Sequence, residues 1–111
     1  MKTIKPTPPE MKFKIIKLPK MIGKSIREVK DYLEKTYPNK LATEEDQEDF
    51  IKSNPKLPEL TWCLFFGSLV RYSVGHWNVP YAGWDGSKWY RDAYWLDGDW
   101  DSPGRVVLLE I

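Results

Sequence analysis

Residues 75–100 constrain the fold more than any other part of the chain, because five of the six tryptophans lie there. Three tyrosines lie in the same stretch, and no other segment can bury a comparable area. The stretch contains two similar units, WDGSKW at 84–89 and WLDGDW at 95–100, and each places Asp-Gly between tryptophans. Asp-Gly is typical of the tight turns that join antiparallel strands. The stretch therefore predicts antiparallel, aromatic-rich strands.

The length and the aromatic distribution predict one domain with its core in the C-terminal half. A chain of 111 residues can bury roughly two thirds of its unfolded surface, which is enough for one modest core. Twelve of the sixteen aromatic residues lie between positions 62 and 100. Cys63 is the only cysteine and lies in the apolar run LTWCLFF, so we expect a buried thiol and a reducing compartment.

No segment has the length and apolarity of a secretion signal or of a membrane span of about 20 residues. We therefore expect a cytoplasmic protein without membrane association. The net charge of +1 hides an asymmetry. Residues 1–40 hold eleven basic against four acidic residues, a balance of +7, whereas residues 61–111 hold four against six, a balance of −2.

Two helices are expected in the N-terminal half. Ser25 followed by Glu28 forms a capping box, and the apolar spacing after it predicts a helix from Ile26 to about Thr36. A second, shorter helix is expected to start after Thr43 and to end near Ser53, because Thr43 can cap a helix and three acidic residues follow it.

The remaining segments are typical of strands. Residues 11–18 predict a short edge strand that is rich in lysine, and residues 60–74 predict one long bent strand or two short ones, with a bulge or turn at Gly67. The C-terminal run RVVLLEI predicts a central strand that is buried on both faces. Together these patterns predict an α+β fold with one or two N-terminal helices on a mainly antiparallel sheet of about four to five strands. The last three strands would form a C-terminal aromatic-rich meander. Residues 1–10 are expected to be a disordered tail, and residues 11–111 one α+β domain.

The loop at Asp85-Gly86 determines which face of the hairpin is free, because a one-residue slip moves every side chain of one strand to the other face. A two-residue loop pairs Tyr81 with Tyr90 and mixes polar and apolar residues on both faces. A three-residue loop of residues 84–86, with Gly86 as a glycine bulge, separates them better. This register predicts a core face that consists of Trp77, Val79, Tyr81, Trp89, Ala93 and Trp95. It leaves an accessible face with the predicted partner-binding residues His76, Tyr90, Asp92 and Tyr94.

Catalytic and metal-binding signatures are weak. Asp97, Asp99 and Asp101 alternate like calcium ligands, but the glycine and glutamate that such a loop needs are missing from it. Cys63 and His76 are the only thiol and imidazole, and burial among aromatic residues would make the thiol unreactive. We therefore expect no enzyme activity, no metal site and no cofactor.

Three kinds of ligand fit an aromatic β-surface. Single-stranded nucleic acid is disfavoured because the aromatic region carries net negative charge. A carbohydrate fits the combination of aromatic and aspartate side chains, but it is less expected in the cytoplasm. A protein partner needs the fewest assumptions, because tyrosine-rich surfaces give rigid contact area at low entropic cost. We therefore expect a small interaction protein that binds another protein, with carbohydrate or single-stranded nucleic acid as the alternative ligand.

Overall fold

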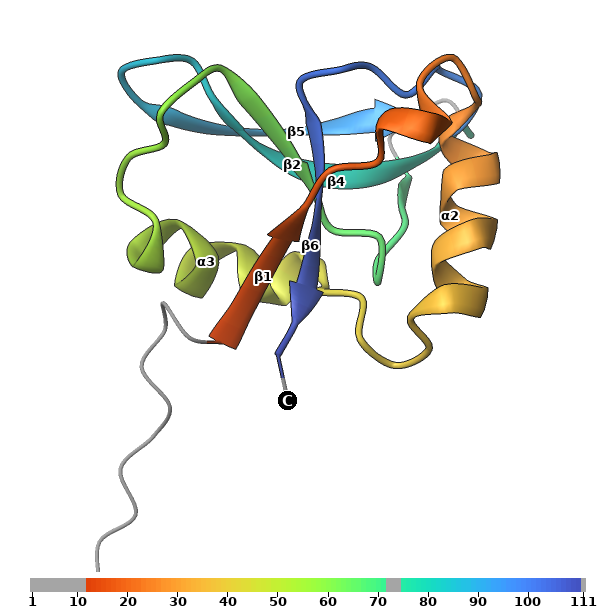
Figure 1. Ribbon diagram of the computed structural model, residues 1–111, viewed down its shortest axis with the longest axis horizontal. Helices are drawn as coiled ribbons and strands as arrows, with labels where there is room; N and C mark the ends of the chain where they lie inside the picture. The colour runs from red at the N-terminus through yellow and green to blue at the C-terminus, as the bar shows by residue number, and fades with distance from the viewer. Residues whose placement is uncertain (1–11, 72–74, 111) are drawn as a thin grey trace, which may run out of the picture.

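The computed structural model describes residues 12–71 and 75–110, and within these ranges it confirms the predicted α+β class (Figure 1). A six-stranded, mostly antiparallel sheet contains β1 (Phe13–Ile16), β2 (Thr61–Leu64), β3 (Val70–Arg71), β4 (Trp77–Trp84), β5 (Trp89–Trp95) and β6 (Gly104–Leu109). The α-helices are α2 (Ile26–Thr36) and α3 (Gln47–Ser53), and the short 3-10 helices are η1 (Pro19–Met21) and η2 (Glu44–Asp46). The tail predicted for residues 1–10 lies outside the described residues.

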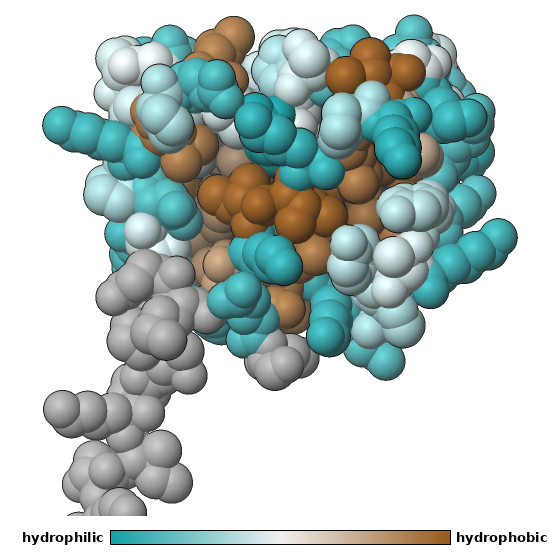
Figure 2. Space-filling view, in the orientation of Figure 1, coloured by the Kyte–Doolittle hydropathy of each residue, from teal (hydrophilic) through white to brown (hydrophobic). Residues whose placement is uncertain are grey.

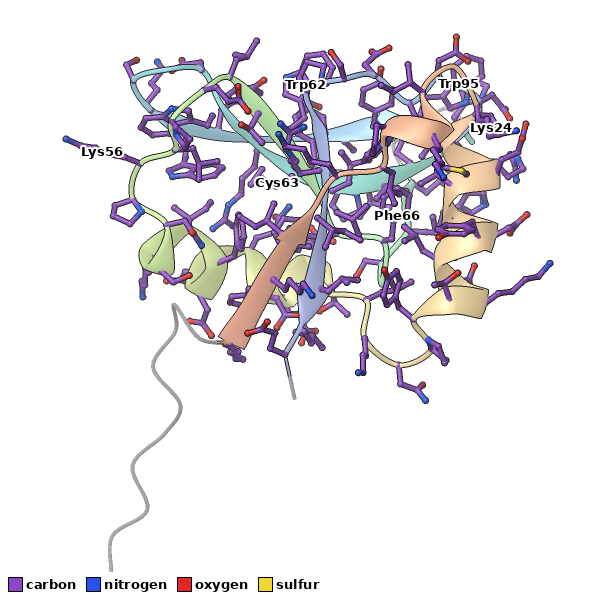
Figure 3. All side chains as sticks on the ribbon, in the orientation of Figure 1. Lys24, Lys56, Trp62, Cys63, Phe66 and Trp95 are labelled. Atoms are coloured by element: carbon purple, nitrogen blue, oxygen red, sulfur yellow. The ribbon has the colours of Figure 1, made fainter. Side chains whose placement is uncertain are left out.

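The sheet has one helix on each face, so the fold has three layers, and Figure 1 views them from the β1 edge with α2 and α3 on opposite sides. Buried side chains form two clusters because neighbouring residues of a strand point to opposite faces. The cluster under α2, the α2-face core, consists of Ile26, Val29, Leu33, Leu64, Phe66, Val79, Leu96, Trp100, Val106 and Leu108. The cluster under α3, the α3-face core, consists of Phe13, Ala42, Phe50, Cys63, Phe65, Ala82 and Val107. In Figure 3, accordingly, Phe66 lies on the α2 side of the molecule and Cys63 in its middle.

The C-terminal strand β6 is interior, as predicted, and five of its six residues are buried. It lies between β1, to which it is antiparallel, and β2, to which it is parallel. β4 follows on the other side of β2, and β5 pairs along the far edge of β4. The prediction that the last three strands form a meander is therefore wrong. The aromatic-rich meander consists of β3, β4 and β5, which are consecutive in the chain and pair antiparallel. β6 is excluded from it because it is apolar on both faces and occupies a position that is covered on both sides of the sheet.

β1 is an edge strand, as predicted, and its described pairing is with β6 alone. Lys14 within the strand and Lys17 directly after it are exposed, and such charges protect a sheet edge from pairing with another chain. Ile15 and Ile16 are half-buried and pack against the α3-face and α2-face cores, respectively. Figure 2 shows apolar residues gathered in the middle of this view, over β1 and β6, with polar residues around them.

The segment after Leu60 forms two short strands, β2 and β3, and Gly67 lies in the turn between them. A Cβ atom on Gly67 would lie 2.5 Å from the Leu41 carbonyl oxygen and 2.8 Å from that of Ala42. The Gly67 amide donates to Ala42 at 2.9 Å. The glycine therefore allows two backbone segments to approach more closely than a side chain would permit.

Helix α2 begins and ends as predicted. The Ser25 hydroxyl accepts a hydrogen bond from the Glu28 amide at 3.2 Å. The amides of Ile26 and Arg27, which have no partner within the helix, donate to the carbonyls of Gly98 and Leu96 at 2.8 and 2.9 Å. The unit WLDGDW at 95–100 therefore forms a turn whose carbonyl groups accept hydrogen bonds from the first amides of α2. It does not form a second hairpin, although its Asp-Gly pair is typical of one.

Helix α3 starts after η2 and ends at Ser53, close to the predicted boundaries. The Thr43 amide donates to Asp46 Oδ2 at 2.8 Å, which fixes the start of this helical segment. Phe50 is fully buried, and its ring makes edge contacts with Phe13, Phe65 and Trp89. A helix of seven residues is stabilised mainly by such packing.

The predicted register of the hairpin is wrong. Trp84 pairs with Trp89, so the loop has four residues, 85–88, and the predicted loop of residues 84–86 does not form. Asp85 Oδ1 accepts hydrogen bonds from the Ser87 amide at 2.8 Å and from the Lys88 amide at 2.9 Å, and these bonds also lower the pKa of Asp85. The side chain of Asp85 therefore organises the loop and sets the pairing of the strands.

The observed register changes the β4 residue with which each β5 residue pairs. Val79, Tyr81 and Gly83 now pair with Tyr94, Asp92 and Tyr90 on the α2 face. Trp77 and Trp95, both expected in the core, are 45% and 47% exposed. Trp89, also expected in the core, is half-buried at the edge of the α3-face core and donates through Nε1 to the Asn54 carbonyl at 2.8 Å.

Candidate functional site

A row of four half-buried aromatic side chains lies on the α2 face of the sheet. Trp62 and Tyr94 have ring centroids 6.1 Å apart, Tyr94 and Tyr81 6.2 Å, and Tyr81 and Tyr90 6.0 Å. The rings come from β2, β4 and β5, which are neighbouring strands. Figure 3 labels Trp62, the β2 member of the row, at the top of the sheet. We call these four residues, with Asp92 and Asp101 beside them, the tyrosine surface.

The tyrosine surface continues the α2-face core beyond the part that α2 buries. Trp62, Tyr81 and Tyr94 pack against this core, but none of the four rings is fully buried. Tyr90 is half-buried because it lies over Gly83, where an added Cβ atom would be 2.3 Å from the Tyr90 ring. Strands and packed neighbours hold the rings, so their side chains have little freedom to lose when a ligand binds.

Two exposed aspartates give the tyrosine surface a negative rim. Asp92 is the register partner of Tyr81, and the Tyr94 hydroxyl donates to Asp101 Oδ2 at 3.0 Å. Burial, together with the hydrogen bond to Asp101 and the nearby charges of Asp101 and Asp99, raises the pKa of Tyr94 to about 12. Burial and the neighbouring Tyr90 and Asp92 also raise the pKa of Tyr81. Both hydroxyls therefore stay protonated, and remain hydrogen-bond donors, to a higher pH than the hydroxyl of an ordinary tyrosine.

Tyr94 is expected to make the folded state less stable at alkaline pH. The unfolded side chain ionises near pH 10 and the folded one near pH 12. Its contribution to stability is therefore complete below pH 10 and is lost as pH rises toward 12. Urea unfolding between pH 9 and 12, followed by circular dichroism, should show a shallower loss of stability for Tyr94→Phe than for the wild type. Tyr32→Phe, at an exposed position on α2, is the control, and equal slopes in both variants would contradict the assignment.

The structure places three of the four predicted partner-binding residues together. Tyr90, Asp92 and Tyr94 lie on one face of β5, although Tyr94 is more buried than the predicted register implies. His76 is exposed, but its ring contacts Trp95 with centroids 5.5 Å apart, and Trp95 lies on the opposite face of the hairpin. His76 is therefore separated from the other three.

Three members of the tyrosine surface were missed by sequence reasoning. Tyr81 was assigned to the core because the predicted register was wrong. Trp62 lies in an apolar run with no sign of partial exposure, and Asp101 was considered only as a calcium ligand. The alternation of Trp62 and Leu64 with Cys63 shows which residues share a face of the sheet. It does not show which residues of that face are only half-buried.

The thiol and the imidazole do not form a catalytic pair. Cys63 is completely buried in the α3-face core, whereas His76 is exposed next to the start of β4. Burial raises the pKa of the Cys63 thiol to about 12, although Arg105 lowers it somewhat. A neutral buried thiol is a poor nucleophile.

The three aspartates considered as calcium ligands have other contacts. Asp97 pairs with Arg27 at 3.3 Å, Asp99 makes a β-bridge with Ser25, and Asp101 accepts from Tyr94. Within residues 12–71 and 75–110, no three His, Cys, Asp or Glu side chains come together as a metal-binding group.

Comparison of the chain with protein families, with curated proteins and with solved structures finds no match. None of the helices in the described part of the chain has the length and apolarity needed to cross a membrane.

Proposed function

We propose that this protein is a non-enzymatic interaction protein that binds a protein partner through the tyrosine surface. The observation that supports this proposal is the row of rings from Trp62 to Tyr90, which is held by three strands and lies beyond the cover of α2. Tyrosine and tryptophan are enriched where proteins bind each other, because they bury a large area and lose little side-chain entropy.

The negative rim favours a partner segment that carries arginine or lysine. Asp92 and Asp101 are exposed beside aromatic rings, and a guanidinium or ammonium group can pair with the carboxylates and stack on the rings. The same rim disfavours nucleic acid, because exposed carboxylates repel phosphates. A neutral carbohydrate fits the rings and can donate hydroxyl hydrogen bonds to the carboxylates, but it carries no positive charge to pair with them.

The proposal is tested by selecting peptides from a random phage-displayed library against the wild-type protein and synthesising those that are enriched. We expect basic residues next to apolar ones in the selected peptides. Tyr90→Ala and Asp92→Asn should each raise the Kd of such a peptide about tenfold, which corresponds to about 1.4 kcal/mol. Both positions lie outside the two cores, so the variants should keep their fold.

Trp95→Ala is the matched control, because it removes an exposed aromatic side chain from the opposite face of the same hairpin. It should change the Kd by no more than about twofold. A larger loss of binding in Trp95→Ala than in Tyr90→Ala would contradict the proposed surface. Binding of oligosaccharides or single-stranded oligonucleotides that is lost in Tyr90→Ala, without selection of basic peptides, would replace the protein partner by that ligand.

A further inference from the structure

A second surface with the opposite charge lies between η1 and the start of α2. It is a groove with a volume of about 490 Å³, and it is lined by Lys17, Leu18, Pro19, Lys20, Met21, Lys24 and Tyr32. Figure 3 places Lys24 next to η1 at the upper end of α2. None of these residues belongs to the tyrosine surface.

The apolar part of the groove is fixed in position. Leu18 and Met21 are half-buried and pack against the α2-face core, and the Met21 amide donates to the Leu18 carbonyl at 3.0 Å. Tyr32 lines the groove and is 42% exposed, and Ile22, which follows Met21 in the chain, is 50% exposed. Figure 2 shows a separate apolar patch at the top of the view, near η1.

The three lysines make the groove positive, and its lining contains no acidic residue. Of these three lysines, Lys24 alone forms an ion pair with a residue in the described part of the chain. Its partner is Glu28 at 3.9 Å, and both side chains are more than half exposed. An exposed pair of this length contributes little, so it leaves the lysine available to another anion.

We propose that this groove binds an acidic segment of a partner protein that also carries an apolar side chain. The apolar side chain enters the groove between Leu18, Met21 and Tyr32, and carboxylates of the same segment pair with Lys17, Lys20 and Lys24. Charge complementarity selects the partner, because a basic or neutral segment offers no carboxylate to the three ammonium groups. A hollow of this volume has room for one or two side chains, whereas a nucleic-acid strand needs several aromatic rings on which to stack, and Tyr32 is the only aromatic residue in the lining.

The test uses fluorescence anisotropy with a labelled peptide that places one leucine and one phenylalanine among glutamates. We expect it to bind the wild-type protein, and we expect the matching peptide with glutamine in place of glutamate to bind much more weakly. The triple variant Lys17→Glu, Lys20→Glu, Lys24→Glu should raise the Kd of the acidic peptide at least about tenfold. Tyr32→Ala should also weaken binding, because it removes part of the apolar lining without touching the core.

A second triple variant, Lys40→Glu, Lys56→Glu, Lys88→Glu, makes the same change in net charge at exposed positions outside the groove. Lys56 lies on the opposite side of the molecule in Figure 3. This variant should change the Kd by no more than about twofold, and both triple variants should melt cooperatively, as measured by circular dichroism. Equal weakening by the two triple variants would show that only net charge matters and would overturn the proposal. Equal binding of the glutamine peptide, or binding of anionic lipid vesicles or oligonucleotides through these lysines in place of the acidic peptide, would overturn it as well.

Discussion

Replacing Trp100 by alanine is expected to lower the free energy of unfolding by about 3–5 kcal/mol, because the substitution leaves a large cavity in a core that cannot close it. Trp100 is 2% exposed, belongs to the α2-face core and packs against Phe66 with ring centroids 6.1 Å apart. Its backbone also exchanges hydrogen bonds with Gly23 and Lys24, so its position is coupled to the start of α2. The melting temperature should fall by about 12–20 °C for a chain of this size.

Trp95→Ala is the control for this prediction. Trp95 lies only five positions earlier but is 47% exposed, and its truncation should change stability by about 0.5 kcal/mol. Urea unfolding followed by far-ultraviolet circular dichroism measures both variants without relying on tryptophan emission. A loss for Trp95→Ala as large as that for Trp100→Ala would contradict the observed register and support the one predicted from the sequence pattern.

Replacing Phe50 by alanine is expected to cost a similar 3–5 kcal/mol, on the other side of the sheet. Phe50 is fully buried, and its ring contacts Phe13, Phe65 and Trp89 at centroid distances of 5.6, 5.4 and 5.8 Å. α3 is too short to be stable without this anchor. Hydrogen exchange should therefore show faster exchange of the α3 amides, in addition to the lower stability measured by urea unfolding.

Lys52→Ala is the control in the same helix. Lys52 is exposed and pairs with Glu48 at 3.2 Å, and loss of such a pair costs about 0.3–0.5 kcal/mol. If Phe50→Ala were no more destabilising than Lys52→Ala, α3 would not be held by the α3-face core. If the α3 amides kept their protection in Phe50→Ala while the protein was globally destabilised, the helix would depend on contacts other than this ring.

Part of the candidate site was predictable. Tyr90, Asp92 and Tyr94 share a face of β5 in either register, because alternation along one strand does not depend on its partner. Which residues of β4 share that face depends on the loop. The Asp85 carboxylate accepts hydrogen bonds from the amides of Ser87 and Lys88, and these bonds stabilise a loop that is one residue longer than predicted. A pattern of apolar and polar residues contains no direct signal for that hydrogen bonding.

Local interactions determined what the sequence by itself predicts correctly: α2 from Ser25 and its apolar spacing, α3 from Thr43, and β6 from its continuous apolar run. Each of these signals acts within a few residues, so the chain reveals it without knowledge of the fold. The tertiary structure alone decided which tryptophans are buried. The hairpin register was predicted on the assumption of one core face and one free face, but the sheet is covered by α2 on one side and α3 on the other. When both faces of a strand pack, apolar residues no longer mark a single face. The sequence pattern therefore does not reveal that Trp100 belongs to the α2-face core, whereas Trp77 and Trp95 lie outside both cores and are exposed.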